Sequence, residues 1–250
     1  VSVAHDLLYA SVEERREFFL EHSDAENARV LVAVGQQLGS PWAIFRDDPC
    51  GFIEIALGEG LWSQQREMIE RFGATTRLAV AASHEVSKTH SAARLVAWFV
   101  MTRPYGSALV LGTADTWAHT RMIWPHLHAL HRRHNLPGRM LDTAWQINGI
   151  EVAFGRAVAN HAPDTVQGYH APEFLLLVDE SGGIPIPLGR AFEGLLASDG
   201  TRCLAIGNPP LIAESWFERI YGSDEWEHLT IGADASPNLT GEDTEECRAC

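Results

Sequence analysis

Residues 77–93 read RLAVAASHEVSKTHSAA, and this stretch decides the fold that we expect. The apolar run Leu78–Ala82 is typical of a buried strand, a short polar loop follows it, and Lys88-Thr89 opens a helix of small apolar residues. This order is that of a phosphate-binding loop, in which backbone N–H groups and the helix N-terminus hold phosphates, the Lys adds a positive charge and the Thr hydroxyl ligates Mg²⁺. The usual pattern has Gly at the first and sixth loop positions, and here these positions are Ala82 and Ser87.

The cations of the chain single out one residue of this stretch. The sequence contains 18 Arg and one Lys, and the Lys is Lys88. A Lys carries a compact ammonium and an Arg a planar fork, and the two are not interchangeable at a crowded phosphate site. The position of the only Lys therefore favours phosphate binding over a chance surface Lys.

The bulk composition is that of an ordinary globular chain. With 250 residues it can bury a full core, as one large α/β domain or as one domain with a small appendage. The apolar stretches fall far short of the roughly 18 residues that a membrane span needs, and no signal peptide opens the chain, so we expect no membrane. Four Cys form no disulfide framework, which favours a reducing cytoplasm. Cys247 and Cys250 form a lone CxxC without the second pair that a zinc site needs.

The net charge of −14 argues against an overall field that attracts nucleic acid. Any DNA contact must then be local or shared between subunits. The segment Arg121–Arg139, with four Arg and four His, is one cationic candidate, and a solvated helical face is an equal alternative. Its His spacing indicates a metal only weakly, because no Cys or carboxylate lies nearby in sequence.

Hydrophobic periodicity predicts strands that alternate with helices. We expect helices at 12–22, 61–72, 89–100, 116–134 with an interruption at Pro125, 188–196 and 213–221. We expect strands at 78–82, 108–112, 174–178, 203–206 and 226–231, and a hairpin turn at Asn148-Gly149. Residues 23–60 are mixed. This alternation predicts an α/β fold, with a mostly parallel central sheet flanked by helices on both faces.

Polar side chains follow two of the predicted strands, as the phosphate loop follows a third. Asp179 and Glu180 come directly after Phe174–Val178, and Asn208 follows Cys203–Ile206. Ligands of an open parallel sheet bind at the carboxyl ends of its strands. We expect Asp179 to hold Mg²⁺, Glu180 to orient and deprotonate a water, and Asn208 to sense a γ-phosphate. An Asp-Glu pair alone is often a simple turn cap, but the apolar strand before it and the phosphate loop upstream favour the functional interpretation. The segment Gly207–Pro210, read alone, is merely a turn.

The segment before the loop adds a possible base contact. Leu61–Phe72 reads LWSQQREMIERF, and Gln65 interrupts its apolar stripe. A Gln in such a stripe needs a hydrogen-bond partner. It either sits at the solvated edge of the stripe or bonds the edge of an adenine.

Together these motifs resemble the ATPase domain of the large terminase subunit of tailed bacteriophages, the motor that packages DNA into procapsids. The resemblance spans Leu61–Asn238 and includes LWSQQREMI, VQGYHAPEFLLLVDES, LAIGNP and IGADASPN. It implies a RecA-like, ASCE-type P-loop NTPase that hydrolyses ATP with Mg²⁺. It implies as partners double-stranded DNA, a homo-oligomeric ring (a pentamer on the portal), the portal protein and the small terminase subunit, all in the host cytoplasm.

The resemblance also assigns roles to residues. Gln65 with Trp62 would contact the nucleotide base, Thr89 and Asp179 would bind Mg²⁺, and Glu180 and Lys88 would be catalytic. Gly207-Asn208-Pro209 would couple hydrolysis to domain movement. The residues that would surround the phosphates are Ala82, Ser83, His84, Glu85, Val86, Ser87, Lys88, Thr89 and His90.

The chain departs from the family pattern in three ways. Both signature glycines are missing, so Ser87 is strained if its φ is positive. Glu85 places a carboxylate in a loop meant for phosphates. The loop has no Arg, and Gln167-Gly168 stands where many relatives have Arg-Gly. A finger from a neighbouring subunit would then supply the missing charge, with Arg156 and Arg190 as guesses.

Two rival functions fit the same motifs. A superfamily-2 helicase shares the glutamine motif and the acidic pair but needs a second RecA-like domain. A degenerate P-loop module would bind a nucleotide or a partner without hydrolysis. For the terminase reading we expect an N-terminal helical or lid region at 1–60, an ATPase core at 61–232, and an acidic linker at 233–250 toward a nuclease domain.

Overall fold

A computed structural model describes residues 2–84, 86–157, 168–208 and 214–242. Its longer helices are α1 (Ser2–Leu8), α2 (Val12–Glu21), α3 (Asp24–Leu38), α5 (Ser63–Ala74), α6 (Lys88–Met101), α8 (Ile123–Arg133), α9 (Ile186–Leu195) and α10 (Trp216–Tyr221). Short helical turns are α4 (Pro49–Gly51), α7 (Trp117–Thr120) and α11 (Pro237–Thr240), with further turns at Ala43–Phe45, Phe52–Ala56, Ser181–Gly183 and Ala233–Ala235. None of the described helices is long and apolar enough to span a bilayer.

The described strands form one eight-stranded sheet in the order β3-β4-β5-β2-β6-β7-β1-β8. Their bounds are β1 (Arg77–Ala82), β2 (Ala108–Thr113), β3 (Arg139–Leu141), β4 (Ala144–Ile147), β5 (Ile150–Gly155), β6 (Glu173–Val178), β7 (Thr201–Gly207) and β8 (Glu227–Ile231). Neighbours from β5 to β8 pair in parallel, and β3-β4-β5 pair antiparallel. The expectation of a mostly parallel sheet is confirmed. Parallel pairing also brings the carboxyl ends of β1, β6 and β7 to the same edge.

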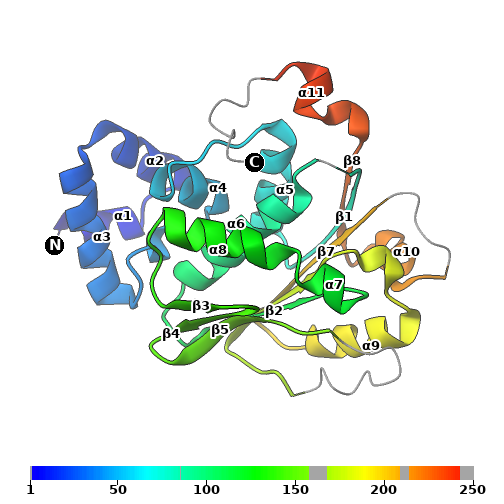
Figure 1. Ribbon diagram of the computed structural model, residues 1–250. Helices are drawn as coiled ribbons and strands as arrows, with labels where there is room; N and C mark the ends of the chain where they lie inside the picture. The colour runs from blue at the N-terminus through cyan, green and yellow to red at the C-terminus, as the bar shows by residue number, and fades with distance from the viewer. Residues whose placement is uncertain (1, 85, 158–167, 209–213, 243–250) are drawn as a thin grey trace.

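Helices cover both faces of the sheet, as Figure 1 shows, with α5, α6 and α8 on one face and α9 and α10 on the other. Side chains of β1 alternate between the two layers: Leu78 and Val80 join the core under α6, while Ala79 and Ala81 join the core under α9 and α10. This alternation follows from the two-residue period of a strand, and burial on both faces explains why the strand sequences are almost continuously apolar.

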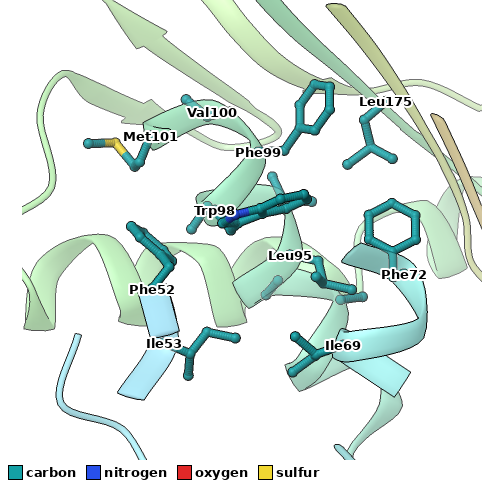
Figure 2. Packing of buried hydrophobic residues seen from close by; sticks show 14 of the residues in the cluster. Phe52, Ile53, Ile69, Phe72, Leu95, Trp98, Phe99, Val100, Met101 and Leu175 are labelled. Carbon is teal, nitrogen blue, oxygen red and sulfur yellow. The ribbon is translucent and has the colours of Figure 1, made fainter. Parts of the chain in front are cut away.

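The larger core is built around α6. Trp98 is completely buried, and Phe72, Leu95, Phe99 and Leu175 surround it (Figure 2). Its indole N–H donates to the carbonyl of Phe45 at 2.8 Å, so the ring is held without an unpaired polar atom. Truncation of a side chain this large in a packed core costs about 3–5 kcal/mol. This packing fixes the helix that begins at Lys88.

The structure corrects two local expectations. The mixed segment contains α3, whose start carries a Ser23–Glu26 capping box and whose end at Gly39 is left-handed (φ 76°). The predicted helix 116–134 breaks between α7 and α8 at residues 121–122 and not at Pro125, because Pro125 lies in the first turn of α8, where its missing N–H costs no helix bond. The hairpin at Asn148-Gly149 is confirmed, with φ of 53° and 78° as a type I′ turn requires.

Candidate functional site

The loop after β1 leads directly into α6, as the sequence predicts. Ser87 is the N-cap of α6 and has φ 56°, in the left-handed region that favours Gly, and its side chain makes no capping bond. Ala82 closes β1 and has no positive φ. Ser87 at the sixth loop position is therefore strained where Gly would not be, whereas Ala82 at the first position is not strained. The first N–H groups of α6 have no side-chain cap and can receive an anion.

Lys88 is only 8% exposed and points to the carboxyl edge of the sheet. Its Nζ donates to Oδ1 of Asn208 and, at 3.4 Å, to the carbonyl of Ala82, and it lies 3.9 Å from Oε1 of Glu180. Asn208 in turn donates from Nδ2 to Oε2 of Glu180 at 2.6 Å. Three predicted site residues from three separate strand exits thus form one chain of polar contacts. β7, which ends one residue before Asn208, pairs with β1 on one side and β6 on the other.

A second contact joins Thr89 to Asp179. The Thr89 hydroxyl donates to Oδ2 of Asp179 at 3.1 Å. Burial and the neighbouring charge of Glu180 raise the pKa of Asp179, while the N–H of Glu180, Thr89 and Lys88 act against the rise. A carboxylate oxygen beside a hydroxyl oxygen is a donor set that suits Mg²⁺, and the charge of the ion would favour the ionised form of Asp179. The pair fits the predicted metal site.

Glu180 leaves β6 in a left-handed conformation, with φ 47°. The turn that follows is tied to the next strand, because the Ser181 hydroxyl donates to the carbonyl of Ile206 in β7 at 2.6 Å. Strained backbone held by its surroundings is common where a side chain must be aimed at a ligand. Here it points the Glu180 carboxylate toward Asn208 rather than along the strand.

The sequence interpretation missed a pair at the end of β2. His119 Nδ1 lies 2.5 Å from Oδ1 of Asp115, and Asp115 packs against the turn at Gly183. The hydrogen bond to Asp115 raises the pKa of His119, and the charges of Glu180 and Asp179 add to the rise. The signal was a polar residue after an apolar strand, the same signal that identified Asp179.

The predicted base-contacting residues lie at the start of α5. Gln65 is only 2% exposed, so the alternative of a solvated position at the edge of the stripe is wrong. Its Oε1 accepts the N–H of Trp62 at 3.4 Å, and the Trp62 side chain is buried in the larger core. Ser63, between them, donates its N–H and hydroxyl to Glu242 at 2.7 and 2.8 Å.

The segment just before α5 is held to the phosphate-loop helix by a buried carboxylate. Glu59 pairs with Arg94 of α6 at 2.7 Å, with His134 at 2.7 Å and with Arg133 at 3.2 Å. Burial raises the pKa of Glu59, but the hydrogen bonds and charges of His134 and Arg94 outweigh this and bring the pKa to about 2. The segment that leads to the predicted base-contacting residues is therefore fixed to α6, the helix that begins at the phosphate loop.

The other predicted residues are more scattered. The Ser83 N–H donates to the Ile231 carbonyl at 2.9 Å, so it is not offered to a phosphate in this conformation. His84 is exposed, Val86 is buried in the core, and the His90 ring lies 5.9 Å from that of His126. Glu85, Gln167, Pro209 and the CxxC of Cys247 and Cys250 lie outside the described residues.

The two guessed Arg residues differ in their surroundings. Arg156, just after β5, donates to the Tyr169 hydroxyl and lies over its ring, whereas Arg190 is exposed on α9 without an ion pair to any described residue. Among the described residues no three His, Cys, Asp or Glu side chains gather in a way that could hold a metal, and this includes the His-rich segment at 121–139.

Comparisons with known proteins point to one fold. No protein-family model matches the sequence, and no curated protein matches it. The large terminase ATPase domain of Thermus phage P74-26 is similar in structure, with a TM-score of 0.56 and 15% identity over 73% of this chain and 85% of that one. The large terminase of thermophilic bacteriophage D6E in complex with ADP has a TM-score of 0.52 and 14% identity over 73% of this chain.

The large terminase of bacteriophage HK97 matches with a TM-score of 0.53 and 12% identity over 74% of this chain. The alignments cover 46% of the D6E chain and 43% of the HK97 chain, so this chain spans under half of either. The eight-stranded sheet, with β7 between β1 and β6, is the RecA-like fold of these phage large terminase ATPase domains.

Proposed function

We propose that the chain binds and hydrolyses ATP as the motor domain of a large terminase. The observation that carries this proposal is the convergence of Lys88, Asn208 and Glu180, with the Thr89–Asp179 pair, at the carboxyl edge of the sheet. Each motif alone has a structural explanation. Their meeting point, at the uncapped start of α6, has the charges and donors that a triphosphate requires.

Lys88 and the first N–H groups of α6 would bind the β- and γ-phosphates. The Lys88 ammonium would exchange its contact with Asn208 for a phosphate oxygen, which leaves Asn208 bonded to Glu180 and close to the γ-phosphate. Thr89 and Asp179 would hold Mg²⁺, which when bound neutralises phosphate charge. Glu180 would orient a water and accept its proton, and Gln65 would bond the adenine.

The same fold supports a role in DNA packaging, which we propose as the purpose of hydrolysis. Double-stranded DNA, further copies of the chain in a ring, the portal protein and the small terminase subunit would be its partners in the host cytoplasm. Without an Arg in the phosphate loop, the transition-state charge would be met by a neighbouring subunit, with Arg156 or Arg190 as donor. Residues 1–60 would act as a helical region beside the core at 61–232.

Two variants test the proposal. Lys88→Ala should abolish ATP binding, because it removes the cation at the phosphates. Glu180→Gln should keep binding and lower hydrolysis by about 10²–10⁴-fold, the range of a general base. Glu225→Gln, which changes an exposed carboxylate paired with Arg77 at the opposite edge, is the matched control. Unchanged hydrolysis in both site variants would end the proposal.

A further inference from the structure

A second polar cavity lies at the amino edge of the sheet, away from the site described above. It has a volume of about 520 Å³ and lies between the ends of α1 and α3, the turn at Ala43–Phe45 and the starts of β6 and β7. β6 separates its Glu173 from Asp179 by six residues of extended chain, roughly 20 Å. A ligand in this cavity would not occupy the phosphate loop.

Cations outnumber carboxylates in the cavity wall. The charged residues that line it are Arg15, Arg46, Arg103, Arg202, Asp47 and Glu173, which gives four positive and two negative charges. Arg15 and Asp47 form an ion pair at 2.7 Å, so their charges cancel. Three Arg therefore share one carboxylate, and the wall carries a net charge of +2 in a chain whose net charge is −14.

The single carboxylate is already divided between two partners. Glu173 contacts Arg46 at 2.6 Å through Oε1 and Arg103 at 2.5 Å through Oε2. Arg202 uses its Nη1 for the carbonyls of Phe72, Gly73 and Thr75 at the end of α5. Arg202 Nε and Nη2 and Arg103 Nη2 have no hydrogen-bond acceptor among the described residues.

The guanidinium groups also repel one another. Burial lowers the pKa of Arg103 to about 10, and the charges of Arg46 and Arg202 add to this effect against the attraction of Glu173. Burial and the charge of Arg46 lower the pKa of Arg202 as well. The Arg103 side chain is only 3% exposed, so the repulsion is weakly screened by water. The α5 and α6 carboxyl ends offset part of this charge, because helix C-termini carry partial negative charge.

We propose that this cavity is a binding site for a phosphate dianion, either inorganic phosphate or the monoester group of a small phosphorylated molecule. Planar guanidinium forks match phosphate oxygens in pairs, and a phosphomonoester carries a charge of about −1.5 to −2 near pH 7, which equals the excess in the wall. A carboxylate or a single DNA phosphodiester carries only one negative charge and would neutralise only half of the +2 charge of the wall. The cavity is larger than one phosphate and leaves room for the remainder of a monoester.

Phosphate would also bind the phosphate loop, so the test uses Lys88→Ala chains. Binding of inorganic phosphate is measured by calorimetry at neutral pH, first with the Lys88→Ala variant and then with the double variant that also carries Arg46→Gln. Arg46 has a half-exposed side chain, so its loss should not unfold the protein. Arg132→Gln, which removes an exposed Arg without an ion pair to any described residue, is the matched control. Ribose 5-phosphate, acetate and a short duplex DNA without terminal phosphates are the comparison ligands.

We expect Lys88→Ala chains to bind phosphate, Arg46→Gln to weaken that binding about tenfold, and Arg132→Gln to leave it unchanged. Ribose 5-phosphate binding at least as tightly as phosphate would identify a monoester as the ligand, and weaker binding would identify free phosphate. The proposal is overturned by absence of phosphate binding, by equal binding with Arg46→Gln, or by acetate or the duplex binding as well as phosphate. Failure of the proposed ATPase would appear instead as Lys88-independent hydrolysis, which this experiment does not involve.

Discussion

The two edges of the sheet hold their charges in opposite balance. At the carboxyl edge one Lys faces two carboxylates, Asp179 and Glu180, and at the amino edge three Arg share one carboxylate, Glu173. Glu173 forms ion pairs with Arg46 and Arg103, whereas burial raises the pKa of Asp179. The comparison teaches that each edge leaves charge without an internal partner, negative at the carboxyl edge and positive at the amino edge, and that each edge therefore suits a ligand of different charge.

Exchange of Glu173 for Gln should produce the largest change in stability. It leaves Arg103 buried and Arg46 and Arg202 without a counter-charge, and removal of one partner of a buried pair costs about 3–5 kcal/mol. Urea unfolding measures the loss. The control is Glu225→Gln, whose exposed pair with Arg77 should change stability by less than about 0.5 kcal/mol. Equal effects in both variants would show that the ion pairs of Glu173 contribute no more to stability than an exposed surface pair.

Lys88→Arg tests why the carboxyl edge uses the only Lys. The ammonium is buried between Ala82, Asn208 and Glu180, and a planar guanidinium is larger and directs its N–H groups differently. We expect ATP binding to weaken about 100-fold, or about 2.8 kcal/mol, although the charge is kept. Arg132→Lys, a swap at an exposed position, should leave ATP binding unchanged. ATP binding by Lys88→Arg as tight as that of the unmodified protein would mean that any positively charged side chain at this position can bind the phosphates.

Asp179→Asn should have the opposite sign to Glu173→Gln. Because burial raises the pKa of Asp179, the folded state favours the protonated form, and ionisation at neutral pH costs stability. The amide should stabilise the ligand-free protein by about 1 kcal/mol at pH 7. The gain should appear as the pH rises from the ordinary value of 3.8 through the raised pKa, and should vanish below 3.8. Melting temperatures across this range measure it, and a loss of stability at pH 7 would refute the contrast.

Ser87→Gly should give the smallest change. A left-handed backbone costs a non-Gly residue about 1–2 kcal/mol, and most of the gain is offset by the greater entropy of Gly in the unfolded chain. We expect a net stabilisation of about 0.5 kcal/mol by thermal unfolding. Ser91→Gly, inside α6, should instead destabilise the protein by about 0.5–1 kcal/mol. A similar loss in both variants would show that Ser87 is not strained.

Local patterns predicted most of the elements that position the site. Apolar runs identified β1, β6 and β7, and the polar residues after them identified Lys88, Asp179 and Asn208. Helix α3 was missed although Ser23 and Glu26 form a capping box, because its buried stripe is narrow and consists of Val30 and Val34. A capping motif is therefore a better guide there than the hydrophobic pattern.

The strand order and the Arg-rich cavity could not be predicted in this way. β7 lies between β6, which precedes it in the chain, and β1, whose paired residues are more than a hundred positions away in sequence. The cavity gathers side chains from Arg15 to Arg202, and periodicity holds no information about such distant partners. Likewise, the partners of Glu59 come from two other helices. Charge balance at each edge became visible only with the fold.

Calorimetric titration with a non-hydrolysable ATP analogue in the presence of Mg²⁺ tests the central claim most directly. The account predicts that the unmodified protein binds one molecule of the analogue per chain and that Lys88→Ala shows no heat of binding under the same conditions. Equal binding by both chains would contradict the account, because the nucleotide would then lie away from the meeting point of Lys88, Asp179 and Glu180.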